Sequence, residues 1–80
     1  MTSAISIAFG GVLRKHREQA AMSQEALAHE TDVHRTYVSL IERGIRNPTL
    51  DVVFRLADAL AIPPSTLVGE TEVRLKRRRK

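Results

Sequence analysis

Residues 23–44 read SQEALAHETDVHRTYVSLIERG, and this stretch decides the fold. Ser23 is a good N-cap, because its hydroxyl can accept a hydrogen bond from a backbone N–H of the first helical turn. The helix that it opens ends near Thr31, and a short turn follows at once. The next helix covers about residues 35–43, and Gly44 is a standard C-terminal stop. The stretch therefore predicts two short helices joined by a turn of about three residues.

The apolar residues of this stretch set which sides of the two helices face inward. Ala28 is small enough to let the helices cross closely, and Val33 closes the turn against the core. Val38 and Ile41 anchor the second helix, so its opposite face points outward. That face holds Arg35, Thr36, Ser39 and Arg43, with Tyr37 at its flank. It carries hydrogen-bond donors and no carboxylate, which suits base edges and phosphates. This is the helix-turn-helix arrangement, and it predicts binding to double-stranded DNA.

Helical periodicity continues on both sides of this stretch. Phe9, Leu13 and Arg17 share one face of a helix expected over residues 6–21. Thr49 caps a further helix, whose apolar positions recur at three- and four-residue steps. These positions are Leu50, Val53, Leu56, Ala57 and Leu60.

Two prolines at residues 63–64 end that helix. Pro64 suits the first turn of a short fifth helix over residues 65–68, which Gly69 ends. No segment alternates with period two for long enough to predict a strand, so we expect an all-α domain of five helices over residues 1–69. The expected core consists of Leu13, Leu27, Val33, Val38, Ile41, Leu50, Val53, Leu56, Leu60 and Leu67.

Length and charge restrict the function further. The 80 residues bound the chain to one small domain, with a net charge of +4. Residues 1–69 hold seven basic and seven acidic side chains, so the whole excess lies in residues 70–80. We expect this segment to be a flexible basic tail. It would act either as a solubilising tail or as an arm that follows DNA.

Several function classes find no support in the chain. There is no cysteine, and His16, His29 and His34 do not share a face at ligand spacing, so we expect neither a metal nor a cofactor. No Ser/His/Asp set, carboxylate pair or glycine-rich phosphate loop indicates an enzyme. No apolar run approaches the ~20 residues that cross a bilayer, and no signal peptide is apparent. We therefore expect a cytoplasmic protein without membrane partners.

Residues 9–68 resemble the Cro/C1-type helix-turn-helix family of phage and bacterial repressors. The resemblance rests on Leu13-Arg14…Arg17, Ser23-Gln24-Glu25…Leu27-Ala28, Tyr37-Val38…Ile41-Glu42-Arg43-Gly44 and Asn47-Pro48-Thr49-Leu50. Residues 34–39 also look like the recognition helix of controller proteins from restriction–modification systems. The resemblance implies a five-helix, lambda-repressor-like domain that binds palindromic operators, usually as a homodimer.

The resemblance also implies roles for individual residues. Those implied to contact bases are Arg35, Thr36, Tyr37 and Ser39. Those implied to contact phosphates are Ser23, Gln24, His34, Arg43, Arg46 and Asn47. Arg17 and Glu42 match a partly buried ion pair that ties the first helix to the third. Asp32 stands in the turn where the family often has glycine. Leu40 stands where some members have a polar side chain that reads bases, so we expect base reading mainly at the start of the recognition helix.

Alternatives remain open for several of these features. Tyr37 could pack its ring against the preceding helix, and Arg43 and Arg46 could be solvated cations at a helix end. A repressor and a controller that activates at one site and represses at another look identical from the sequence, and RNA polymerase is a candidate partner. The alternative function is an antitoxin that also sequesters a toxin. We expect a dimer surface formed by Val52, Ile62, Leu67 and Val68.

Overall fold

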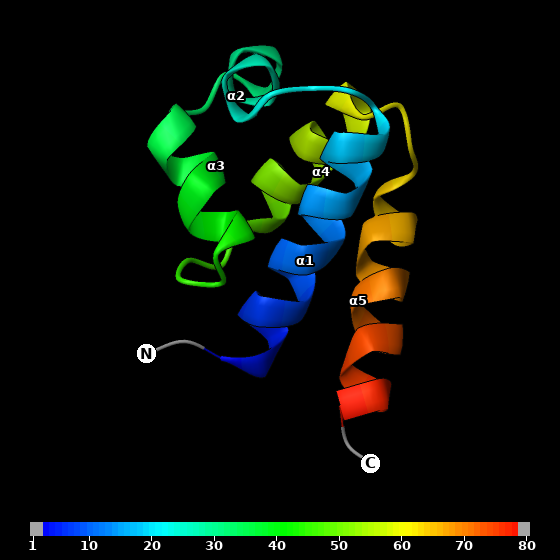
Figure 1. The fold of residues 1–80 in the computed structure, drawn as a ribbon. Coiled ribbons are helices and arrows are strands. Elements are labelled where there is room, and N and C mark those ends of the chain that lie inside the picture. The colour runs from blue at the N-terminus through cyan, green and yellow to red at the C-terminus, as the bar shows by residue number, and fades with distance from the viewer. Residues whose placement is uncertain (1–2, 79–80) are drawn as a thin grey trace.

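The computed structural model describes residues 3–78. It contains five helices and, within this range, no strand, which confirms the predicted all-α class. In chain order they are α1 (Ala4–Gln19), α2 (Gln24–Thr31), α3 (Arg35–Glu42), α4 (Leu50–Ala59) and α5 (Pro64–Arg78). Figure 1 shows α1 between α3 on one side and α5 on the other, with α2 at one end of the bundle.

Local hydrogen bonds explain where most helices begin. Ser23 Oγ accepts from the backbone N–H of Ala26 at 2.9 Å, and Thr49 Oγ1 accepts from that of Val52 at 3.2 Å. Each bond satisfies a donor that the first helical turn would otherwise leave free. At the end of α2, Asp32 adopts the left-handed conformation with φ +56° and closes the turn. Asp is one of the few non-glycine residues that visit this region routinely, so it can replace the usual glycine.

The core lies where α1, α3 and α4 meet α2 and α5. Its fully buried large side chains are Val12, Leu13, Leu27, Val38, Ile41, Leu56 and Leu67. Most of the predicted core is present, and Val33 is half-buried against it. Leu50 was expected inside, but 69% of it is exposed. It lies in the first turn of α4, at the start of the apolar stripe, where no neighbouring element covers it, and Val52 of the same turn is buried instead.

The fifth helix differs most from its expected form. The prediction that it stops at Gly69 is wrong, because α5 runs from Pro64 to Arg78 and the expected domain boundary falls inside it. A mid-helix glycine costs only about 1 kcal/mol, which contacts with α1 offset. Thr71 is buried and donates to the Leu67 carbonyl at 2.7 Å, and Glu70 bonds to α1. Residues 79–80 of the expected basic tail lie outside the described residues.

Candidate nucleic-acid interface

Buried residues fix the orientation of α3. Val38 and Ile41 are fully buried, so the opposite side of the helix faces solvent. The predicted outward residues lie there: Arg35, Thr36 and Arg43 are exposed, and Ser39 is half-exposed. The structure therefore brings the predicted base-contacting face together as one surface of donors.

The start of α3 is held by a side-chain cap. His34 Nδ1 accepts a hydrogen bond from the backbone N–H of Thr36 at 3.2 Å. The neutral ring therefore carries its proton on Nε2, the only nitrogen left to act as a donor. Arg35 follows as the first residue of α3, at the helix end where the backbone dipole also favours anions. Two predicted DNA-contacting residues thus stand side by side at the leading end of the helix.

The end of α3 is closed by a glycine turn. Gly44 has φ +76°, and its N–H donates to the Ile41 carbonyl at 3.0 Å. The N–H of Ile45 donates to the Leu40 carbonyl at 2.9 Å, which completes a Schellman motif. The motif turns the chain so that the Arg46 guanidinium lies 5.5 Å from the centre of the Tyr37 ring. Tyr37 is half-buried and packs against the core.

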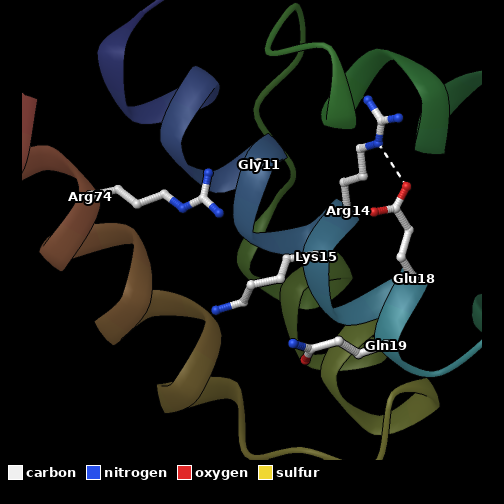
Figure 2. Close-up of a pocket in the computed structure, with 6 residues that line it drawn as sticks. All are labelled: Gly11, Arg14, Lys15, Glu18, Gln19 and Arg74. Carbon is white, nitrogen blue, oxygen red and sulfur yellow. Dashed lines mark hydrogen bonds and ion pairs between the residues drawn. The ribbon is translucent and has the colours of Figure 1, made fainter.

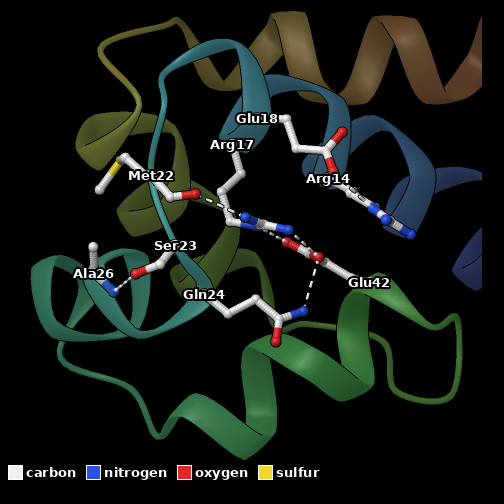
Figure 3. Close-up of polar contacts among 8 residues, drawn as sticks. All are labelled: Arg14, Arg17, Glu18, Met22, Ser23, Gln24, Ala26 and Glu42. Atoms are coloured by element: carbon white, nitrogen blue, oxygen red, sulfur yellow. Dashed lines mark hydrogen bonds and ion pairs between the residues drawn. The ribbon is translucent and has the colours of Figure 1, made fainter.

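Arg17 and Glu42, implied as an ion pair, are joined by two hydrogen bonds. Arg17 Nε donates to Glu42 Oε2 at 2.6 Å, and Arg17 Nη2 donates to Oε1 at 3.1 Å (Figure 3). The hydrogen bond to Glu42 raises the pKa of Arg17, and burial opposes this to a lesser extent. Arg17 Nη1 also donates to the Met22 carbonyl at 2.7 Å. Glu42 therefore lies at the end of α3 with its charge neutralised.

Gln24 belongs to the same network. Its Nε2 donates to Glu42 Oε1 at 3.0 Å, which orients the side chain at the first position of α2 (Figure 3). One amide proton and the amide oxygen remain for another partner. The sequence pattern indicated the ion pair but not this third member, whose contact depends on how α2 crosses α3.

The loop after α3 is fastened to α1. Ser6 is buried, and its hydroxyl donates to Asn47 Oδ1. Gly10 lies so close to α3 that a side-chain carbon there would come within 2.4 Å of the Ile41 carbonyl oxygen. Sequence reasoning missed both contacts. A glycine inside a helix weakens it, but it also permits the close approach of another backbone, as it does here.

A second group of charged side chains lies away from this surface, between α1 and α5. Arg14, Lys15 and Arg74 line an open depression of about 530 Å³ (Figure 2). Glu70 of α5 accepts from Lys15 Nζ at 2.5 Å and lies 2.9 Å from His16 Nε2. These hydrogen bonds, first that from Lys15 and then that from His16, lower the pKa of Glu70. They fasten α5 to α1.

Residues 3–78 contain no group of three or more His, Cys, Asp or Glu side chains that could hold a metal ion. No single helix within them is long and apolar enough to cross a bilayer; α4 and α5 reach that composition only when taken together, across a 109° bend.

Comparison with known proteins identifies the family. Residues 13–67 match the helix-turn-helix family. The chain is 45% identical over 74 residues to the control protein C.BamHI of Bacillus amyloliquefaciens, with 91% of each chain covered. It is similar to the structure of the restriction-modification controller protein C.AhdI from Aeromonas hydrophila, with 42% identity, a TM-score of 0.79, and 81% of this chain and 98% of that chain covered.

The DNA complex of SinR, a master regulator for biofilm formation, is also similar, with 26% identity and a TM-score of 0.72. That match covers 75% of this chain and 97% of the other. This chain therefore belongs to the Cro/C1-type helix-turn-helix family of transcriptional regulators, which are DNA-binding proteins and not enzymes.

Proposed function

We propose that this protein regulates transcription in the cytoplasm by binding palindromic DNA operators as a homodimer, with α3 (Arg35–Glu42) in the major groove. The observation that carries the proposal is the exposed donor face of α3, held on the core by Val38 and Ile41. A helix of this diameter fits the major groove, where each base pair presents a distinct pattern of donors and acceptors.

Base reading is assigned to the outward side chains of α3. Arg35 stands at its leading end, and its planar guanidinium can donate two hydrogen bonds to O6 and N7 of one guanine. Thr36 and Ser39 present hydroxyl groups that donate or accept, and Tyr37 presents its phenol at the flank of this face.

Phosphate contacts are assigned to residues on both sides of that face. They are Ser23 and Gln24 at the start of α2, His34 before α3, and Arg43, Arg46 and Asn47 after it. The assignment of these phosphate contacts rests on position. A helix in the major groove has a phosphate backbone on each side of it, and these residues lie on either side of α3. Neutralisation of Glu42 by Arg17 removes the carboxylate that would oppose the phosphates.

The proposed dimer surface is an apolar patch that the monomer leaves open. Leu50 and Phe54 are 69% and 55% exposed and lie one turn apart on α4. Ile5, Pro48 and Val68 line an adjoining depression of about 230 Å³. Val52 and Leu67, expected on the dimer surface, are buried, so their contribution to it is excluded. Burying exposed apolar area of this kind is the usual driving force for association.

Restriction–modification control is the favoured biological role, because the similar proteins C.BamHI and C.AhdI carry that description. This favours the controller over the antitoxin alternative. A controller that activates a promoter also contacts RNA polymerase, which we propose as a second partner. Transcription from the promoters of the genes beside its own, measured with and without this protein, tests the role.

Sedimentation with a selected DNA duplex tests the binding proposal. Wild-type protein is used to enrich tight binders from a randomised duplex pool. We expect a palindrome whose half-site centres are about 34 Å apart, bound by two chains. Phe54→Asp should lower the fraction of dimer in free protein and weaken operator binding. Glu18→Gln, at an exposed position of α1 outside both the apolar patch and the α3 face, should change neither. A monomer that occupies a single half-site would contradict the proposal.

A further inference from the structure

The exposed face of α3 contains one aliphatic side chain among its polar ones. Val38 and Ile41 are fully buried, but Leu40 is half-exposed and lies on the side of the helix that also bears Thr36 and Arg43. The core does not need Leu40, since the buried cluster is complete without it. An aliphatic side chain that packing leaves outside is available for a ligand.

Leu40 lines an open depression of about 470 Å³ beside α3. Val33, Leu40 and the Tyr37 ring supply apolar surface to it. His34, Thr36 and Arg46 supply polar groups at the same site. The depression therefore combines carbon surface with hydrogen-bond donors and a cation.

The apolar and cationic parts of the site are rigidly connected. The Leu40 carbonyl accepts from the N–H of Ile45 at 2.9 Å and from that of Arg46 at 3.3 Å. The Arg46 guanidinium also lies over the Tyr37 ring, 5.5 Å from its centre. The backbone that carries Arg46 is thus fixed relative to Leu40, and the guanidinium lies beside the Tyr37 ring of the same depression.

We propose that this depression binds the C5-methyl group of a thymine in the major groove, with Leu40 as the contacting side chain and Arg46 on a nearby phosphate. The inference rests on the proposed function, since it requires α3 to enter that groove. The thymine methyl is the apolar group that a base pair presents on its major-groove edge. Cytosine in its place carries only hydrogen at C5 and so offers Leu40 no methyl group, and its N4 amino group would lie beside an aliphatic side chain that has no acceptor.

The test removes the methyl group alone. A preferred duplex, selected by the wild-type protein from a randomised pool, is remade with uracil in place of each thymine in turn. At one thymine per half-site, uracil should weaken wild-type binding about threefold to fivefold, the loss expected for one buried methyl group. Leu40→Ala should weaken binding to the thymine duplex by a similar factor and show no further loss with uracil at that position.

Two matched variants separate this contact from a general effect. Leu40→Met keeps an aliphatic contact and should retain the response to uracil. Ser39→Ala leaves Leu40 in place and should also retain it, whatever its own effect on affinity. A wild-type protein that binds every uracil duplex as tightly as the thymine duplex overturns this inference alone, and so does a Leu40→Ala variant that keeps the full response. A pool that yields no preferred duplex overturns the proposed function as well.

Discussion

Arg17 Nε and Glu42 Oε2 lie 2.6 Å apart and join α1 to the last residue of α3. Only 12% of the Arg17 side chain and 3% of the Glu42 side chain are exposed. An ion pair so far removed from water gives little net stability, because desolvation opposes the attraction. The pair instead orients the helices relative to one another. Glu42 of α3 also accepts a hydrogen bond from Gln24, so one carboxylate connects α1, α2 and α3.

Removing Arg17 should be costly even though the pair gives little net stability. Arg17→Ala would leave the Glu42 carboxylate buried without its cation, and we expect a loss of about 3 kcal/mol in the free energy of unfolding. Urea denaturation measures this. Arg14→Ala is the control, because the Arg14–Glu18 pair is mostly exposed and should contribute less than about 0.5 kcal/mol. Equal losses in the two variants would show that Glu42 does not depend on Arg17.

Local signals predicted much of this fold. Ser23 and Thr49 cap their helices by hydrogen bonds within one turn, and Gly44 closes α3, so all three act through near neighbours in sequence. Such signals can be identified without knowing the tertiary structure.

The features that sequence reasoning placed wrongly depend on distant contacts. Leu50 satisfies the apolar spacing of α4, but whether it is covered depends on what lies beside the first turn. The extension of α5 past Gly69 depends on Glu70 meeting Lys15 and His16, which lie more than fifty positions earlier in the chain. Gln24 and Ser6 likewise find their partners only once the helices cross.

Gly10 in α1 and Gly69 in α5 should respond oppositely to substitution by alanine. Gly10→Ala places a carbon 2.4 Å from the Ile41 carbonyl oxygen and 2.7 Å from that of Glu42, both backbone atoms that cannot rotate away. We expect it to lower stability by about 2 kcal/mol or more through overpacking. Gly69→Ala meets no atom within 4 Å and should raise stability by about 0.5–1 kcal/mol through helix propensity. Thermal unfolding of both variants checks this, and stabilisation by Gly10→Ala would show that α1 and α3 are not in close contact.

The contact of Glu70 with α1 should make stability depend on pH. Hydrogen bonds from Lys15 and His16 lower the pKa of Glu70 below its ordinary value of 4.5, so the ionised form stabilises the fold. This contribution is present above pH 4.5 and is lost as pH falls through the lowered pKa. Because the site is partly exposed, Glu70→Gln should cost less than about 1 kcal/mol at neutral pH.

Denaturation of wild type and Glu70→Gln at a series of decreasing pH values measures that difference, which should disappear once the pH falls below the lowered pKa of Glu70. Glu72→Gln provides the comparison, since Glu72 is mostly exposed and pairs with its helical neighbour Lys76. A wild-type advantage over Glu70→Gln that persisted unchanged at low pH would rule out ionisation of Glu70 as its source.

The central claim is that Arg35, at the start of α3, reads a base. Wild type, Arg35→Ala and Arg46→Ala are titrated at one salt concentration against the selected operator, each of its single-base substitutions and a random duplex. Arg35→Ala should weaken binding to the operator by about 1–3 kcal/mol and binding to random DNA by much less. It should also lose the preference at one base position per half-site. Arg46→Ala, which would remove the proposed phosphate contact, should weaken binding to all duplexes by a similar factor. If Arg35→Ala instead lowers affinity for every sequence equally, Arg35 contacts the backbone and α3 does not read the operator through it.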